Sequence, residues 1–166
     1  MILVLLGTQD NSFKRLLKEI ENCIDKNVIK EEVIVQAGNT KYVSNKMKIY
    51  DFFAPDKLNE LIKKSNYVIT HGGVGSIIQT IRNGKKVIAV PRKQEYKEHV
   101  NNHQMQIVEN FDIKGYIIGL KEVQDLSNAI VKVHTFEPEK YVSNTENFIK
   151  IIEDYIDNNQ NKMLNK

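Results

Sequence analysis

One short stretch, His71-Gly-Gly-Val-Gly-Ser76, has the residue types of an anion-binding turn. Glycines let a backbone approach a ligand closely, and the free N–H groups at the start of a following helix favour an anion. An apolar run at 67–69 precedes the stretch, and apolar residues at helical spacing follow it at 74–81. A second apolar run follows at 87–90. The stretch is therefore predicted to join a strand to a helix at the edge of a parallel sheet where ligands bind.

Two further groups of polar residues follow predicted strands. Gly7-Thr8 comes directly after the apolar run 2–6, and a polar loop, 92–99, follows the run 87–90 and leads to His103-Gln104. The carboxyl ends of parallel strands meet at one edge of a sheet, so we expect both groups to lie near the glycine turn. Taken singly, each group has an ordinary explanation. A histidine at a strand end is more often structural, and His103 with Gln104 alone would be a helix surface.

Several common signatures of nucleotide and metal sites are absent. The sequence has no GxxxxGK[ST] motif, which excludes a P-loop ATPase, and neither Gly7-Thr8-Gln9 nor Gly73-Val74-Gly75 completes GxGxxG. It has no Asp-x-Asp pair and no HExxH spacing, so we expect no catalytic metal and no bound cofactor. Cys23 is the single cysteine, which excludes an intramolecular disulfide, and its helical spacing predicts a small core residue.

Composition indicates an ordinary globular chain. It has 166 residues, of which 41% are hydrophobic and 27% charged. We expect one domain at 1–157 and a polar tail at 158–166. The net charge of +3 is too small to indicate nucleic acid. Basic residues gather at 82–97, and we expect a solvated rim there, or else a surface for an anionic ligand or membrane. These residues are Arg82, Lys85, Lys86, Arg92, Lys93 and Lys97.

Apolar patterns place short strands between helices along the chain. Continuous apolar runs predict buried parallel strands, and apolar spacing of three and four predicts helices. Asn11 or Ser12 is expected to cap the first helix. The alternation predicts a single Rossmann-like, doubly wound parallel sheet of about six strands. The predicted strands are 2–6, 32–36, 47–52, 67–69, 87–90 and 116–118, and the predicted helices are 13–24, 55–62, 74–81, 100–111, 123–130 and 148–156.

The glycine turn and the polar segment after it resemble a known family. The turn, followed by Gln79, is similar to the donor-binding half of GT-B glycosyltransferases of the MurG type, the glycosyltransferase family 28 C-terminal domain. Pro91-Arg92 and Glu98-His-Val-Asn-Asn-His-Gln104 resemble its small single-domain members. Those members are subunits of two-part transferases in lipid-linked oligosaccharide, capsule or exopolysaccharide synthesis. The turn Leu5-Leu6-Gly7-Thr8 is similar too, so the resemblance covers nearly the whole chain.

The resemblance implies roles for particular residues. The glycine turn would bind the diphosphate of a UDP-sugar, Gln79 would meet the ribose, and His103 with Gln104 would hold sugar hydroxyls. Gln79 stands where the family more often has Glu or Asp. His71 and His99 are the candidates for a catalytic group, as neighbours of the leaving group or the sugar. The residues expected at the substrate site are Gly7, Thr8, His71, Gly72, Gly73, Gly75, Ser76, Gln79, Arg92, Glu98, His99, Asn102, His103 and Gln104.

The resemblance also implies a partner. In two-domain relatives the acceptor site, and usually the general base, lie in an N-terminal domain that this chain is expected to lack. We therefore expect a membrane-anchored subunit that binds a lipid-linked saccharide acceptor. This chain would bind UDP-galactose or UDP-N-acetylglucosamine and transfer the sugar with inversion and without a metal. The apolar stripe at 148–156 would dock the partner or pack on its own sheet.

The cellular location follows from the same expectation. The apolar run 2–6 is too short for a signal peptide or a membrane span. We expect a cytoplasmic protein that its partner holds at the inner face of the membrane.

Two other classes of protein stay open. A non-catalytic nucleotide-binding or signalling module would share the fold, although a receiver domain needs acidic residues where this chain has Gly7-Thr8. A nucleotide-sugar epimerase of the same architecture would need two domains. Binding of UDP without turnover fits both the transferase half and the binding module. Turnover after addition of a membrane partner would separate them.

Overall fold

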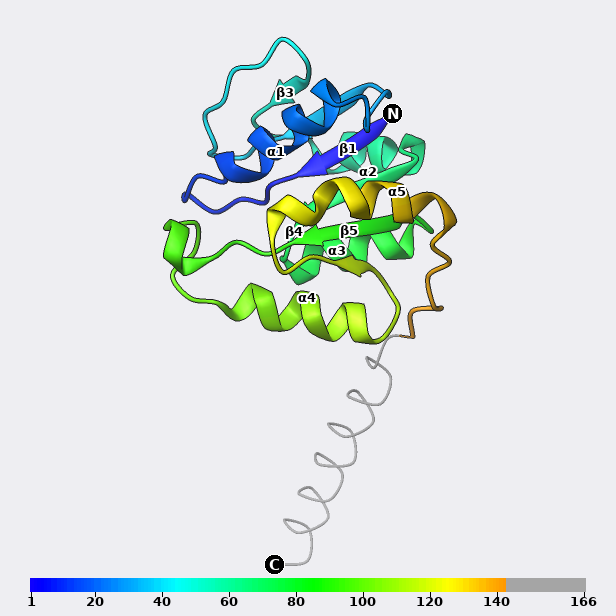
Figure 1. Cartoon of the computed structure of the whole chain (residues 1–166). Helices are drawn as coiled ribbons and strands as arrows, with labels where there is room; N and C mark the ends of the chain where they lie inside the picture. Colours follow the sequence, from blue (N-terminus) through cyan, green and yellow to red (C-terminus); the bar gives the residue numbers. More distant parts are fainter. Residues whose placement is uncertain (143–166) are drawn as a thin grey trace, which may run out of the picture.

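The protein is built around one open sheet of six parallel strands (Figure 1). The computed structural model describes residues 1–142. The strands lie in the order β3-β2-β1-β4-β5-β6, and every neighbouring pair is parallel. This confirms the predicted Rossmann-like, doubly wound sheet. The strands are β1 (Ile2–Leu5), β2 (Val33–Gln36), β3 (Lys48–Tyr50), β4 (Tyr67–His71), β5 (Lys86–Val90) and β6 (Ile118–Gly119).

The order of the strands reverses at β1. From β1 the chain moves outward to form β2 and β3, and then returns to form β4 on the other side of β1. Leu5 consequently pairs with Gln36 on one side and with Thr70 on the other. Open sheets bind ligands outside the carboxyl ends of the strands at such a reversal. The fold thus places the turn after β1 next to the turn after β4.

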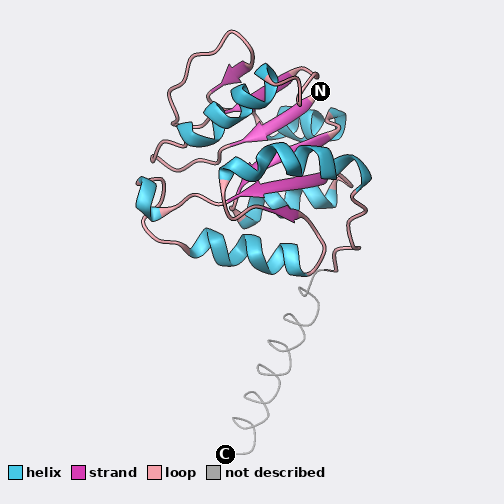
Figure 2. Cartoon of the chain, viewed as in Figure 1, coloured by secondary structure: helices cyan, strands magenta, loops and turns pink. Residues whose placement is uncertain are grey.

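Helices cover both faces of the sheet (Figure 2). α1 and α5 pack on one face, and α2, α3 and α4 pack on the other. Val4 of β1 faces the first group and Leu5 faces the second. Both sides of β1 are therefore buried, which explains its continuous apolar run. The helices are α1 (Lys14–Asp25), α2 (Pro55–Lys64), α3 (Val74–Arg82), α4 (His103–Ile113) and α5 (Leu126–Thr135), with 3-10 turns η1 (Gln94–Tyr96) and η2 (Val123–Asp125).

The start of α1 differs from the prediction. Neither Asn11 nor Ser12 caps this helix, because its N-cap residue is Phe13. The Phe13 N–H group instead donates a hydrogen bond of 3.0 Å to the Thr40 hydroxyl. The partner of this N–H group comes from a distant loop, so the local sequence did not reveal it. The core position predicted for Cys23 is confirmed, and burial raises the pKa of its thiol to about 11.

Other element boundaries also differ. The helix predicted at 100–111 begins only at His103, after a loop that contains η1. The helix predicted from Val123 begins with η2, and α5 starts at Leu126. β3 ends at Tyr50, two residues earlier than predicted. These shifts lengthen the loops at the carboxyl edge of the sheet.

Two of the predicted segments lie beyond residue 142. The predicted helix at 148–156 and the tail at 158–166 lie outside the described residues, so both stay predictions. The helices found within residues 1–142 are all too short or too polar to cross a membrane.

Candidate functional site

Three loops meet at the carboxyl edge of the sheet. They are the turn after β1, which begins near Gly7, the turn after β4 at Gly72, and the loop between β5 and α4. The Arg92 guanidinium in the third loop donates a 2.7 Å hydrogen bond to the Leu6 carbonyl in the first. The Gln104 side chain accepts a 3.1 Å hydrogen bond from the Gly72 N–H group in the second. The structure thus confirms that the predicted loops lie together.

His71 ends β4 and lies between the two glycine turns. Its Nδ1 atom is 3.3 Å from the Leu5 carbonyl oxygen, and its side chain is only 7% exposed. A Cβ atom at Gly7 would lie 2.5 Å from His71 Nε2, and one at Gly73 would lie closer still. Gly7 also has φ of +79°, in the region that favours glycine. The ring therefore occupies the space left by two absent side chains.

The environment of His71 keeps its ring neutral at neutral pH. Burial, and next the positive charge of Arg92, lower the pKa of His71 to about 4. A carbonyl oxygen can only accept a hydrogen bond, so Nδ1 carries the proton that points at Leu5. Nε2 then presents an unshared electron pair to the glycine turns. This side chain can accept a hydrogen bond or take up a proton at the site.

α3 begins at the glycine turn without a side-chain cap. Gly73 is the N-cap residue, and no described side chain bonds to this helix end. The first N–H group bonded within the helix is that of Ile77, which donates to the Gly73 carbonyl at 3.2 Å. The N–H groups of Val74, Gly75 and Ser76 therefore precede the helical ladder. Such groups, together with the helix dipole, attract anions.

Gln104 supports the glycine turn from within the protein. Its side chain is buried, and its Oε1 atom accepts hydrogen bonds of 3.1 Å from the N–H groups of both Gly72 and Arg92. A Cβ atom at Gly72 would lie 2.8 Å from Gln104 Cβ and 3.0 Å from Val108. Gly72 is thus required for close packing against α4. Because the Oε1 atom is occupied by these two hydrogen bonds, the sugar contact predicted for Gln104 would have to come from its amide nitrogen.

Arg92 and Lys93 are buried, so these two residues do not belong to the solvated rim or anion-binding surface expected of the basic residues at 82–97, whereas Arg82 and Lys97 are exposed. Arg92 has no exposed area, and its guanidinium also donates to the Asn11 carbonyl oxygen at 2.5 Å. The Lys93 ammonium forms an ion pair with Glu122. Both cations therefore have partners within the chain. Arg92 was predicted to contact the substrate, but its buried side chain does not face the site directly.

Glu98 is buried as well, and it pairs with a residue that sequence analysis missed. The Arg15 Nε and Nη2 atoms donate to the two Glu98 carboxylate oxygens at 3.0 and 2.8 Å. This pair fastens the loop after β5 to α1. Glu98 was predicted to contact the substrate, but it forms an internal ion pair instead. No local pattern marks Arg15, because its partner lies 83 residues away.

The other polar side chains of this loop are more accessible. His99 is half-buried, and its Nε2 atom lies 3.2 Å from the side-chain nitrogen of Gln9, beyond β1. The Asn102 side chain accepts a 3.0 Å hydrogen bond from the Gln94 N–H group. His103 is exposed at the first turn of α4. These side chains lie at the rim of the edge where a ligand would arrive.

A surface cavity of about 430 Å³ runs along α3 beside the glycine turn. A Cβ atom at Gly75 would meet no other atom within 4 Å, so this glycine leaves the cavity open. The cavity brings together Gly75 and Gln79, the residues predicted at the diphosphate and the ribose. Its lining residues are Val74, Gly75, Ile78, Gln79, Arg82 and Asn83.

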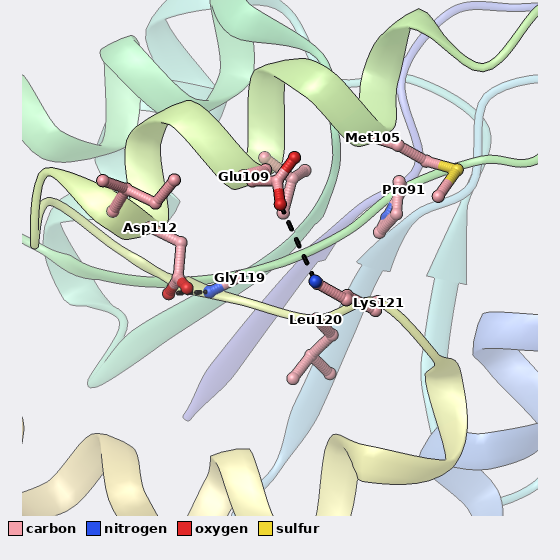
Figure 3. A pocket seen from close by; sticks show the side chains of 9 residues that line it. Pro91, Met105, Glu109, Asp112, Gly119, Leu120 and Lys121 are labelled. Atoms are coloured by element: carbon pink, nitrogen blue, oxygen red, sulfur yellow. Dashed lines mark hydrogen bonds and ion pairs between the residues drawn. The ribbon is translucent and has the colours of Figure 1, made fainter.

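A second cavity, of about 410 Å³, lies between α4 and the segment 119–121 (Figure 3). The Asp112 carboxylate accepts a 2.8 Å hydrogen bond from the Gly119 N–H group, and Glu109 and Lys121 form an ion pair of 3.7 Å across it. None of the predicted site residues lines this cavity. The glycine turns, and not this cavity, therefore define the candidate site.

An exposed aromatic ring lies beside the first glycine turn. Phe52 is 52% exposed, and its ring lies 3.7 Å from the position of a Cβ atom at Gly38. Gly38 in turn packs so closely on Gly7 that a side chain there would overlap the Gly7 carbonyl oxygen. Aromatic faces stack on nucleobases. Sequence analysis missed Phe52 because it placed this residue inside a strand, although an aromatic residue at a strand end was a usable signal.

Metal-binding side chains are not gathered in the described part of the chain. Within residues 1–142, no group of three or more His, Cys, Asp or Glu side chains is placed to hold a metal ion. The metal-independent chemistry expected from the sequence stays a prediction.

The sequence matches a known family along almost its whole length. Residues 1–159 match the glycosyltransferase family 28 C-terminal domain. UDP-N-acetylglucosamine transferase subunit ALG13 of Homo sapiens is 32% identical over 62 residues, which make up 37% of this chain and 5% of that protein. The chain thus corresponds to a small part of that relative's length.

Solved structures share the fold at low sequence identity. A glycotransferase of kitacinnamycin superposes with a TM-score of 0.51 at 14% identity, covering 79% of this chain and 34% of that one. The spinosyn rhamnosyltransferase SpnG superposes with a TM-score of 0.50 at 13% identity, covering 81% and 36%. At such identities the likeness concerns the fold alone.

Proposed function

This chain belongs to the glycosyltransferase family 28 C-terminal domain family, and on that premise we propose that it binds a UDP-sugar between the turns that follow β1 and β4. One observation carries the proposal. The uncapped N-terminus of α3 opens beside His71 and Gly7 at the point where the strand order reverses. Free N–H groups at that point suit a diphosphate.

The same groups would assist the departure of UDP. Negative charge develops on the diphosphate as the bond to the sugar breaks. N–H donors that already point at this position stabilise that charge without reorganising. In this proposal the donors are the N–H groups of Val74, Gly75 and Ser76, and no metal is needed. The sugar passes to the acceptor with inversion of the anomeric carbon.

The rest of the donor would lie along the edge of the sheet. Gln79 lines the cavity that Gly75 leaves open, which is where the ribose would bind. Phe52 offers a stacking face for the uracil ring. His103 and the Gln104 amide nitrogen would meet the sugar hydroxyls from the start of α4. His99 and His71 stay the candidates for a catalytic group.

We propose that the donor is UDP-N-acetylglucosamine and that a membrane-anchored partner binds a lipid-linked saccharide acceptor. The similarity to the human relative, a subunit of a UDP-N-acetylglucosamine transferase, supports this donor over UDP-galactose and supports a partner. The partner would hold the chain at the cytoplasmic face of the membrane. A place in capsule or exopolysaccharide synthesis is a variant of the same proposal with a different acceptor.

Two measurements test this function. Calorimetry on the purified chain should show UDP binding, and a protein that binds no UDP or UDP-sugar would refute the proposed site. Co-expression with a membrane-anchored subunit encoded nearby, followed by assays with a panel of UDP-sugars, should give turnover of one donor. UDP binding without turnover in any such reconstitution would favour the non-catalytic nucleotide-binding module.

A further inference from the structure

Arg92 connects all three loops of the candidate site. Its guanidinium donates to the carbonyl oxygens of Leu6 and Asn11 in the loop after β1, at 2.7 and 2.5 Å. Its backbone N–H group shares the Gln104 side-chain oxygen with the Gly72 N–H group. Arg92 itself belongs to the loop after β5. A single residue therefore fixes the spacing between the two glycine turns and the start of α4.

The charge of Arg92 is buried without a matching carboxylate. Glu98, the buried acid nearest in the sequence, directs both carboxylate oxygens at Arg15, and only its backbone carbonyl accepts from Arg92, at 3.2 Å. None of the described carboxylates forms an ion pair with Arg92. Phe13 lies against the guanidinium, 4.9 Å from ring centroid to Cζ. The guanidinium is held by carbonyl dipoles and a ring, and the Glu98 carboxylate, although it is bonded to Arg15, offsets part of its charge. A charge buried in this way is weakly screened by solvent.

The field of this charge reaches the glycine turns. Arg92 bonds to Leu6, the residue directly before Gly7. Its positive charge is also the second cause of the lowered pKa of His71, whose ring touches both turns. A positive potential that disfavours a protonated histidine must favour an anion at the same place. The α3 N-terminus contributes a potential of the same sign.

We propose that Arg92 is a positioning residue whose buried charge selects for the anionic part of the donor without touching it. This inference rests on the proposed function, because it assumes that a diphosphate binds at the glycine turns. Its two effects are separable. Positioning of the loops affects every ligand of the site, whereas the charge affects ligands in proportion to their own charge.

Comparison of UDP with UMP isolates the effect of the charge. The two ligands share uridine and differ by one phosphate group, so their Kd ratio cancels a general loosening of the site. Arg92→Met keeps much of the side-chain volume and removes the charge. We expect it to weaken both ligands and to lower the preference for UDP over UMP by roughly three- to fivefold. Glu98→Gln removes a buried negative charge, and we expect it to raise the preference.

Controls distinguish the possible outcomes. Lys97→Met removes an exposed cation from the same loop and should leave the preference unchanged, since water screens that charge. If Arg92→Met does not fold, two other variants take its place. Arg92→Lys keeps the charge but loses the fork of donors, so it should weaken the binding of both ligands equally. Glu98→Gln still measures the effect of the buried charge on the preference for UDP over UMP. An unchanged preference in Arg92→Met, or in Glu98→Gln where the former does not fold, would overturn the inference. Absence of UDP binding by the unaltered protein would instead refute the proposed function, and the inference with it.

Discussion

The imidazole ring of His71 fills the space in which a side chain at Gly73 would lie. Gly73 has φ of −81° and ψ of 121°, which any residue can adopt, so backbone geometry does not require glycine there. The requirement comes from the ring, because a Cβ atom at this position would overlap His71 Nε2. The histidine and the glycine therefore form one unit. Neither can change size alone.

This unit gives a double-mutant prediction. Gly73→Ala should destabilise the protein by about 1–3 kcal/mol, since the added methyl group displaces the ring from the Leu5 carbonyl. The double variant that also carries His71→Ala should recover part of that loss, because the space is then free. Urea denaturation of the two single variants and the double variant measures the coupling. Strictly additive effects would show that the ring does not occupy this space in solution.

A second prediction concerns Gly75, where a side chain meets nothing within the protein. Gly75→Ala should leave the free energy of unfolding unchanged or raise it by up to about 1 kcal/mol, since alanine favours helix. It should nevertheless weaken UDP binding by about 1 kcal/mol or more, because the methyl group enters space assigned to the nucleotide. Thermal unfolding and calorimetry test the two parts. Undiminished UDP affinity would move the nucleotide away from α3.

A third prediction concerns acid stability. The pKa of His71 is lowered from 6.5 to about 4 in the folded protein. The unfolded chain therefore takes up a proton between these pH values and the folded protein does not, so stability is lost as pH falls from 6.5 to 4. The loss should approach the order of 3 kcal/mol. Denaturation across this pH range measures it.

His71→Gln supplies the control for the acid prediction, because glutamine does not titrate. This variant should show a flatter pH dependence between 6.5 and 4 than the unaltered protein. Parallel curves for the two proteins would mean that His71 titrates near its ordinary pKa when folded.

A fourth prediction separates the two ends of the Gln104 amide. Gln104→Ala leaves the N–H groups of Gly72 and Arg92 without an acceptor and should cost roughly 1–3 kcal/mol for each group. Gln104→Glu keeps an acceptor oxygen and should restore much of that stability while losing the amide nitrogen. His103→Ala, at an exposed position, should affect stability little. Equal stability of Gln104→Ala and His103→Ala would contradict the supporting role of Gln104.

A fifth prediction concerns metal ions. Transfer by the reconstituted enzyme should survive EDTA, because helix N–H groups and not a cation are proposed to hold the diphosphate. Initial rates before and after chelation test this, with added Mg²⁺ or Mn²⁺ as the control. Loss of activity that either ion restores would require a different account of diphosphate binding.

The centre of the sheet was predictable because β1, β4 and β5 are buried on both faces. The runs 2–6, 67–69 and 87–90 are continuously apolar, and each lies within or overlaps a parallel strand of the structure. The convergence of the loops followed from the same pattern, since parallel strands share a carboxyl edge. The exact ends of the elements were harder to predict, because distant residues help to set them. The start of α1 is an example, where the Phe13 N–H group bonds to Thr40.

The roles of the charged residues were not predictable. Arginine and glutamate are ordinarily exposed, so Arg92 and Glu98 were expected at the surface or at a ligand. Their partners lie 81 and 83 residues away, at Asn11 and Arg15. A local pattern cannot reveal such pairs. Ligand binding by Gly75, Gln79, His99 and His103 stays a prediction, because their positions fit it without testing it.

The central place of β1 has a consequence for synthesis of the chain. One edge of β1 pairs with β2, about thirty residues later in the chain. Its other edge pairs with β4, where the partner of Leu3 is Val68. Until β4 has left the ribosome, one edge of an entirely apolar strand is unpaired. Such edges join strands of other chains readily. The nascent chain therefore passes through an aggregation-prone interval that ends only when β4, followed by the glycine turn, has emerged from the ribosome.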